Sequence, residues 1–236
     1  MIKDLNKKYW KQVPAEKTTS MDILPSEEIL KHIPKSGNIL DIGCGDGQLA
    51  EWFSQKSFQV SGIDINQNAI KACQNKKTNV DYSLQDITTK TTFNDSFFDL
   101  VCSKFTLANI HQAEWDLFRK EIKRIVKPGG YAWVVEPLVS ESYADRYKLA
   151  QDLFTDKHAI FVFKDPNLAR SITTSKDLED AISREEISRI SRHYTKKELL
   201  NLFPSFNIIN EEIHKIKSPS GYNLNVFIGL LKKESN

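Results

Sequence analysis

The sequence NILDIGCGDGQLAEWF, residues 38–53, joins a short apolar run to a helical pattern through a glycine-rich turn. The apolar run predicts a buried strand, and the residues after the turn predict a helix. Between them the backbone lacks Cβ atoms at Gly43, Gly45 and Gly47, so it can adopt unusual angles and a ligand can approach closely. The first N–H groups of the following helix have no partner within it and carry partial positive charge. The stretch therefore predicts a ligand site at the end of a strand.

Strands and helices alternate after this stretch. The predicted strands span 58–65, 80–85, 97–103 and 131–136, the last ended by Pro137. The predicted helices span 47–55, 66–75 and 112–126, with Asn66 as a cap and a KPGG turn after the third. Such alternation predicts an α/β fold with a doubly wound parallel sheet and right-handed crossovers.

The C-terminal part follows a different rule. A helix is predicted over 196–203, and two strands over 207–216 and 223–231 are separated by a turn that contains SPSG. Two strands joined by a tight turn must run antiparallel. These elements are expected to complete the sheet begun by the earlier strands.

Two segments lie outside the alternating core. The N-terminal arm has apolar residues at helical spacing (Ile2, Leu5, Tyr9 and Val13) with lysines between them, and a short helix is predicted between Ser26 and Pro34. The segment 139–194 is polar, favours helix and is too long for an ordinary connection. We therefore divide the chain into an arm or lid (1–36), a ligand-binding core (37–138), a helical insertion or lid (139–194) and a closing helix and strand pair (195–236).

Composition sets limits on function. The chain has 236 residues, 40% of them hydrophobic and 27% charged, with a net charge of +2. This balance gives no general attraction to nucleic acid or anionic membranes, and no run approaches the length of a membrane helix. The three cysteines, Cys44, Cys73 and Cys102, form no CxxC pair and argue against a disulfide framework or a metal site. A soluble, cytoplasmic protein with no membrane partner is expected.

Three carboxylates narrow the choice of ligand. Asp64 and Asp86 end the second and third strands, where they can accept the hydroxyls of a ribose and the exocyclic amine of an adenine. Asp41, in the first strand, puts a negative charge beside the glycine turn, which disfavours a pyrophosphate and suits a cationic amine. Gln48 also replaces the last glycine of a nicotinamide-dinucleotide fingerprint. Adenosine together with an ammonium group indicates S-adenosylmethionine.

The order and spacing of ILDIGCGDG, GIDIN, LQDI, FDLVCSKFTLANI and RIVKPGGYAWVVEP resemble class I S-adenosylmethionine-dependent methyltransferases over residues 38–138. The resemblance implies a Rossmann-like, seven-stranded, mostly parallel sheet with an antiparallel last strand, and S-adenosylhomocysteine as product. It also implies the residues of the cofactor site. These are Asp41, Gly43, Cys44, Gly45 and Gly47 at the methionine part, Asp64 and Ile65 at the ribose, Gln85, Asp86 and Ile87 at the adenine, and Ser103, Lys104 and Phe105 along the transfer crevice.

A proton acceptor is needed if the methyl acceptor is a phenol or a protonated amine. His111, His158, His193 and Glu136 are candidates, and the resemblance implies that Asn109 and His111 face the acceptor. We take His111 and Asn109 as the catalytic candidates, although either can instead begin a helix.

The N-terminal arm and the insertion indicate which class of molecule accepts the methyl group. Tyr9 is expected on an aromatic side of the arm that closes the cofactor pocket while the lysines stay in water. Aromatic residues of the insertion can form an apolar acceptor pocket: Tyr143, Tyr147, Phe154, Phe161 and Phe163.

A basic stretch in the insertion offers a competing interpretation. Arg184, Arg189 and Arg192 can meet an anionic substrate, but Glu185 and Glu186 between them favour a solvent-exposed, salt-bridged helix. We therefore expect methylation of N, O or C of a small organic molecule. The alternatives are an RNA or protein methyltransferase and a non-catalytic S-adenosylmethionine-binding protein.

Overall fold

The computed structural model describes residues 5–14, 22–153, 158–165, 172–217 and 223–235. Its main sheet has seven strands in the order β3-β2-β1-β4-β5-β9-β8. Their bounds are β1 Asn38–Ile42, β2 Gln59–Asp64, β3 Val80–Leu84, β4 Phe98–Lys104, β5 Val126–Leu138, β8 Phe206–Lys217 and β9 Asn223–Lys233. β1 to β5 pair in parallel, whereas β9 is antiparallel to both β5 and β8. The predicted fold class is confirmed.

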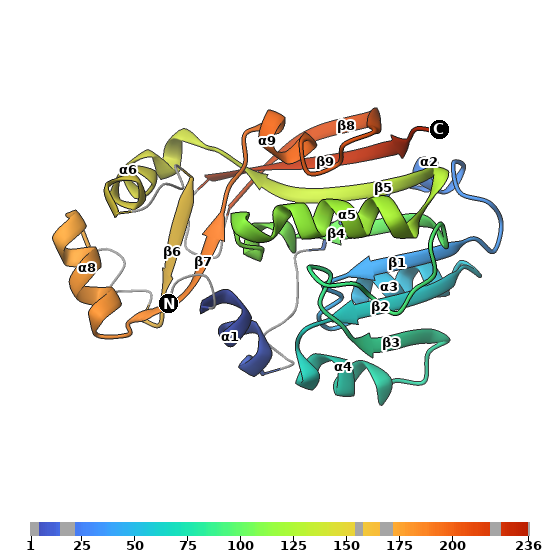
Figure 1. Cartoon of the computed structure of the whole chain (residues 1–236), viewed down its shortest axis with the longest axis horizontal. Helices are drawn as coiled ribbons and strands as arrows, with labels where there is room; N and C mark the ends of the chain where they lie inside the picture. The colour runs from blue at the N-terminus through green and yellow to red at the C-terminus, as the bar shows by residue number, and fades with distance from the viewer. Residues whose placement is uncertain (1–4, 15–21, 154–157, 166–171, 218–222, 236) are drawn as a thin grey trace.

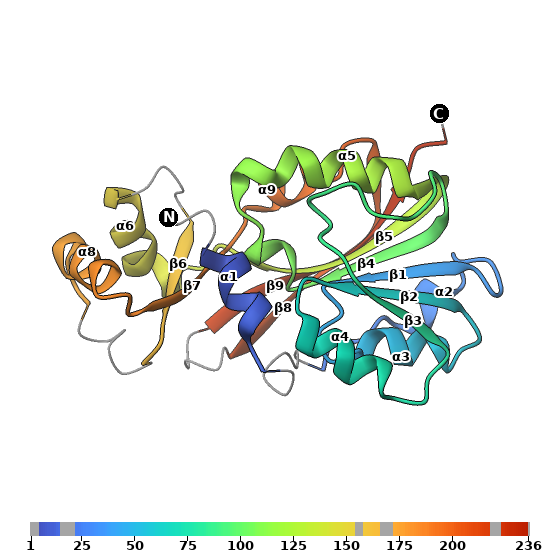
Figure 2. The ribbon, with the colours of Figure 1, turned by 60° about the horizontal axis from the view of Figure 1, so that its bottom comes forward.

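Helices cover both faces of this sheet (Figure 2). α2 Glu27–Leu30, α3 Gln48–Ser54 and α4 Gln67–Gln74 pack on one face, and α5 Trp115–Ile125 and α9 Lys196–Leu200 pack on the other. Alternate residues of a strand point to opposite faces, so Ile39 joins the first core and Leu40 joins the second. Both cores are formed by strands that are hydrophobic on each side, as expected for a buried parallel sheet.

The strand order reverses between β1 and β4, because the chain adds β2 and β3 on one side of β1 and β4 and β5 on the other. Open α/β sheets bind ligands at the carboxyl ends of the strands beside such a reversal. In Figure 1 these ends point toward α1 (Leu5–Gln12) and the second, two-stranded sheet.

β5 is longer than predicted. The KPGG segment, predicted as a turn before the strand, lies within it. Phe98 of β4 pairs with Val126 and Leu100 pairs with Tyr131, so the residues of β5 between Val126 and Tyr131 form a bulge. Pro137 does not end the strand either. The pairing of β5 with β4 stops at Val135, so at Pro137 the only neighbouring strand is β9, where it pairs with Val226. The missing N–H of Pro137 therefore removes no bond to β4.

The insertion is not wholly helical, which corrects the prediction. It contains η5 Glu141–Tyr143, α6 Ala144–Leu153 and α8 Ser175–Ser183, but also β6 Ala159–Phe163 and β7 Ile187–Arg192, which pair antiparallel. The predicted salt-bridged helix around Arg189 is therefore wrong. Glu185 has a φ of 56°, which ends the helical run two residues before β7 begins.

The arm forms a helix that lies against distant parts of the chain. α1 spans Leu5–Gln12 and contacts β7 and α4 (Figure 1). Its helical prediction is confirmed for these residues, whereas Ile2 falls outside the described residues. α2 is shorter than predicted, and Ser26 occupies its N-cap position without a side-chain cap bond. Within the described segments, no helix has the length and apolar character needed to cross a membrane.

Candidate active site

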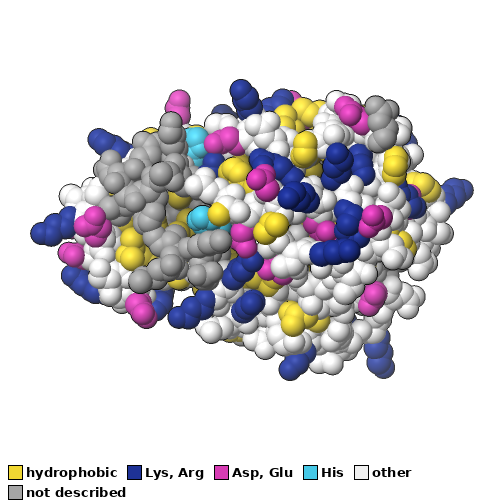
Figure 3. Space-filling model, viewed as in Figure 1, with side chains coloured by type: hydrophobic (Ala, Val, Ile, Leu, Met, Phe, Trp, Pro, Cys, Tyr) yellow, Lys and Arg dark blue, Asp and Glu magenta, His cyan; other side chains and the backbone are white. Residues whose placement is uncertain are grey.

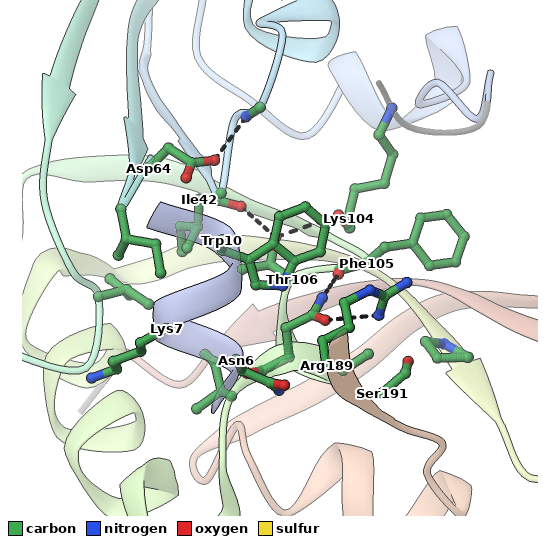
Figure 4. Close-up of a pocket in the computed structure, with 18 of the residues that line it drawn as sticks. Asn6, Lys7, Trp10, Ile42, Asp64, Lys104, Phe105, Thr106, Arg189 and Ser191 are labelled. Carbon is green, nitrogen blue, oxygen red and sulfur yellow. Dashed lines mark hydrogen bonds between the residues drawn. The ribbon is translucent and has the colours of Figure 1, made fainter. Parts of the chain in front are cut away.

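A cavity of about 620 Å³ lies at the carboxyl ends of the central strands (Figure 4). One side is formed by the last residues of β1, β2 and β4 and by residues directly after β1 to β4, and we call it the strand-end side. The other, the insertion side, is formed by η5, α6, β6 and β7. Lys7 and Trp10 of α1 line the cavity as well, so the arm contributes to its wall.

The glycine turn approaches its neighbours too closely for side chains. Gly43 has a φ of 68°, and a Cβ added there would lie 2.4 Å from Oγ1 of Thr106. That hydroxyl donates to the carbonyl of Ile42 at 2.8 Å, so the turn packs directly on the segment after β4. Gly43, Cys44 and Gly45, which the sequence analysis assigned to the methionine part of the cofactor, line the cavity. Gly47 does not; it is the left-handed N-cap of α3.

Asp64 connects the end of β2 to the glycine turn. One oxygen accepts a hydrogen bond from the backbone N–H of Gly45 at 3.0 Å, and the other accepts from Asn66 at 2.8 Å. Burial raises the pKa of Asp64, although these backbone bonds favour the anion. The carboxylate lines the cavity beside Ile65 and retains lone pairs for a further donor.

Asp41 is the buried carboxylate of the strand-end side. It is only 3% exposed, and among the described residues its Oδ2 has no hydrogen-bond partner. Burial raises its pKa to about 7, against the opposing charge of Lys104. A buried carboxylate oxygen without a donor is unfavourable unless a ligand supplies one. The ammonium group of S-adenosylmethionine fits this requirement.

Asp86 already has a cationic partner from the arm. Lys7 Nζ lies 2.8 Å from Asp86 Oδ2 and 2.5 Å from Glu114 Oε1. Burial would raise the pKa of Asp86, but the bonds from Lys7 and Thr88 outweigh it and lower that pKa. The prediction that the arm lysines stay in water is thus wrong for Lys7. Asp86, Gln85 and Ile87 all line the cavity.

Of the three residues predicted to line the cavity at the end of β4, two do so and one is buried beneath it. Lys104 and Phe105 line the cavity, and Phe105 has a φ of 56°. Ser103 is 2% exposed and instead donates to Glu136 at 3.1 Å. Glu136 is fully buried, outside the lining, and accepts from the backbone of η3 (Leu107–Asn109), as at Leu107. Burial raises its pKa to about 8, against these bonds, so Glu136 holds this segment in shape.

The two catalytic candidates are separated by the structure. Asn109 lines the cavity, and its Nδ2 donates to the carbonyl of Phe105 at 2.8 Å. His111 is outside the lining; its Nδ1 accepts from the backbone N–H of Ala113 and caps the short helix η4 (Gln112–Glu114). That is the helix-start role that the sequence also allowed. Tyr9 is likewise not a lining residue, and its ring packs edge-on against Trp10.

The insertion side brings together three residues that the sequence did not group: His193, a candidate proton acceptor, Arg189, for which a solvent-exposed helix was preferred, and Ser191, which had no role. Arg189, Ser191 and His193 line the cavity, and their spacing of two is the signal that was missed, because it is the period of a strand. Burial lowers the pKa of His193 to about 3, so its imidazole is neutral at pH 7. Its Nδ1 lies 2.7 Å from the hydroxyl of Tyr147.

The predicted aromatic pocket is present in part. Tyr143, Phe161 and Phe163 line the cavity. Tyr147 lies behind them and contacts His193, and Phe154 falls outside the described residues. Other lining residues had no role in the sequence-based prediction: Asn6, Thr106, Arg146 and Ile160.

Comparison with known proteins agrees with this geometry. Residues 40–134 match the family described as "Methyltransferase domain". Over this segment the chain is similar to methyltransferases, and its fold is that of a solved S-adenosylmethionine-dependent methyltransferase. The matched segment contains every acidic residue of the strand-end side discussed above, from Asp41 to Asp86.

The alignments with individual relatives cover only about half of each relative. A demethylmenaquinone methyltransferase of Chlorobaculum tepidum is 28% identical over 132 residues, 56% of this chain and 50% of the relative. A ubiquinone/menaquinone biosynthesis C-methyltransferase of Hydrogenovibrio crunogenus is 32% identical over 125 residues, 46% of this chain and 48% of the relative. The chain thus spans about half the length of these curated relatives.

The fold is shared over more of the chain. A crystal structure of an S-adenosylmethionine-dependent methyltransferase from Methanosarcina mazei superposes with a TM-score of 0.74 and covers 91% of this chain and 100% of its own, at 24% identity. The fold of this chain, beyond residues 40–134 alone, is therefore found in a solved protein.

Proposed function

We propose that this protein transfers a methyl group from S-adenosylmethionine to N, O or C of a small organic acceptor. The observation that carries the proposal is the continuity of the cavity: the acidic strand-end side and the apolar insertion side line one space. Direct displacement requires donor and acceptor to be aligned in one water-poor site.

The strand-end side holds the cofactor. When bound, S-adenosylmethionine supplies an electrophilic methyl group on a sulfonium. Asp41 binds the ammonium group, Asp64 accepts hydrogen bonds from the ribose hydroxyls, and Asp86 with Ile87 receives the adenine. The unpaired oxygen of Asp41 and the lone pairs left on Asp64 support this assignment.

The arm and the insertion enclose the acceptor. Asn6 Nδ2 donates to the carbonyls of Asn109 and Ile190 at 2.8 and 2.7 Å, and its Oδ1 accepts from the N–H of Ile190 at 2.7 Å. These bonds hold α1 against β7 and η3, over the space between the two sides. Two relatives named for methylation in quinone biosynthesis support a small acceptor with an apolar body.

His193 hydrogen-bonds the nucleophilic atom of the acceptor and orients it; because its pKa is about 3, the imidazole stays neutral and the proton is lost to solvent. The neutral imidazole lines the cavity and has a tyrosine hydroxyl on its other side, which orients it. Asn109 helps to position the acceptor from the segment after β4. His111 receives no such role here, because it caps η4 outside the lining.

Charge supports a small molecule over RNA. On the face seen in Figure 3, basic and acidic side chains are interspersed. Lys7 of the arm, which an RNA-binding surface would use for phosphates, instead pairs with two carboxylates. The three cysteines are buried free thiols, which supports a cytoplasmic location.

The test is transfer of a labelled methyl group from S-adenosylmethionine into cell extract separated into small molecules, RNA and protein. We expect label in the small-molecule fraction. Label in RNA or protein would contradict the acceptor class, and binding of S-adenosylhomocysteine with no label in any fraction would indicate a non-catalytic binding protein.

A further inference from the structure

The insertion side of the cavity contains a partly buried cation. Arg189 of β7 reaches the cavity together with Ser191, two residues further on the same strand face (Figure 4). His193, directly after the strand, lines the cavity as well. The surrounding wall is largely apolar, from Ile160, Phe161 and other residues of β6.

Arg189 has neutral neighbours. Its Nη1 donates to Asn109 Oδ1 at 3.2 Å, and it forms a hydrogen bond with the side chain of Tyr9. The guanidinium carbon lies 5.4 Å from the ring centre of Trp10. In the described parts of the chain no carboxylate pairs with Arg189, whereas Arg192, three residues later, pairs with Glu198 at 2.9 Å.

This arrangement leaves a positive charge to be neutralised. Burial lowers the pKa of Arg189, yet a guanidinium remains protonated at neutral pH. A buried charge is costly unless it is paired, and the remaining N–H donors form a planar fork that matches a carboxylate. The neutral contacts hold this fork in place without supplying its counter-ion.

We propose that Arg189 binds an anionic group of the acceptor, so that the acceptor is a small organic acid with an apolar body. The proposal rests on the proposed function and specifies its substrate class. The apolar wall receives the body, Arg189 receives a carboxylate or another ionised oxygen, and His193 lies at the nucleophilic atom.

The carboxylate of the cofactor is a second possible source of the same chemistry. Two observations favour the acceptor. Arg189 belongs to the insertion side, whereas the carboxylates that receive the cofactor follow the strands of the sheet. Lys104, whose charge acts on Asp41, already places a cation on the strand-end side. The experiment separates the two sources.

The first experiment fractionates small-molecule extract on an anion exchanger before labelled S-adenosylmethionine and the protein are added. We expect acceptor activity in the retained, acidic fraction. Arg189→Gln should lower that activity by at least about tenfold, Arg189→Lys should retain part of it, and the affinity for S-adenosylhomocysteine should change less than about twofold. Arg184→Gln, at an exposed arginine of the same insertion, is the matched control.

Acceptor activity confined to the unretained fraction would overturn the proposal. So would a tenfold loss of S-adenosylhomocysteine affinity in Arg189→Gln, because it would assign the guanidinium to the cofactor. If the wild-type protein transfers no label in any fraction, the proposed function fails. The binding experiment below then still tests whether Arg189 binds an anion.

The second experiment needs no turnover. Binding of 2-naphthoate and 2-naphthamide, which differ in charge at one group, is measured by calorimetry with S-adenosylhomocysteine present and again without it. The acid should bind at least about tenfold more tightly than the amide, and Arg189→Gln should abolish the difference. Equal binding of the two probes to the wild-type protein would refute the anion site.

Discussion

The strand-end side and the insertion side of the cavity are assembled over very different distances in the sequence. Asp41, the glycine turn and Asp64 lie within a single strand–helix–strand unit. On the other side, Asn6 bonds to Ile190, 184 residues away, and Arg189 meets Asn109 across 80 residues. The first side is a local motif that the family shares over residues 40–134, whereas the second depends on how separate segments dock.

This contrast predicts which substitutions affect which ligand. Changes on the strand-end side should alter cofactor affinity, and changes on the insertion side should alter acceptor turnover at nearly constant cofactor affinity. A variant that moves both quantities together would show that the two sides are not separable.

Asp64→Ala should have the largest effect. Loss of a charged acceptor for two ribose hydroxyls, at about 1.5–3 kcal/mol for each such bond, should weaken S-adenosylhomocysteine binding by about 100-fold or more in calorimetry. Asp81→Ala, at an exposed carboxylate of β3, is the control. Since Asp64 also holds the N–H of Gly45, Asp64→Asn should be measured beside it. Unchanged affinity in both variants would remove the ribose assignment.

His193→Gln should lower turnover by about tenfold or more at an unchanged Kd for S-adenosylhomocysteine, because the imidazole faces the acceptor. His111→Gln should keep more than about half of the turnover, since its ring only caps η4. The two variants are compared in the labelled-methyl assay. The reverse order of effects would restore His111 as the catalytic histidine.

Cofactor affinity should depend on pH through Asp41. With a pKa of about 7, this carboxyl is neutral and unable to attract an ammonium group in acid, and it ionises as the pH rises. Affinity for S-adenosylhomocysteine should therefore increase roughly tenfold between about pH 5.5 and about pH 7. His193, with a pKa of about 3, does not titrate in this range. Asp41→Asn should bind more weakly and show a flat profile; a persistent slope would assign the titration to another group.

Asn6→Ala should have the smallest effect. It removes the bonds from the arm to Asn109 and Ile190, which should lower stability by about 1–3 kcal/mol and turnover several-fold. Lys8→Ala, at an exposed residue of the same helix, is the control in thermal unfolding and in the labelled-methyl assay. Full turnover despite lower stability would mean that the arm supports the fold but does not enclose the acceptor.

The sequence predicted the strand-end side well, because strand ends of a parallel sheet meet at one edge whatever the loops do. The order of motifs sufficed to bring Gly43, Asp64 and Asp86 to one cavity. The extent of β5 was missed, since a bulge and an edge pairing tolerate the glycines and Pro137 inside a strand.

The insertion side was not predictable in the same way. The charged residues around Arg189 fit the period of a helix and also that of a strand. β7 forms because β6 provides a strand with which it can pair. The side chain of Arg189 faces the cavity only as a result of that pairing. Lys7 was assigned to solvent because its two acidic partners are far away in sequence.

The bonds between Asn6 and Ile190 also order events during synthesis of the chain. The arm is made first, but its place on the molecule does not exist until β7 has been made, nearly the whole length of the chain later. Segments fold as they leave the ribosome, in sequence order. The glycine turn and its acidic partners can therefore assemble while the acceptor wall is still missing, and the arm docks among the last steps. A nascent chain stopped after β5 would contain every strand-end carboxylate but none of the residues of β6 and β7 that face the acceptor.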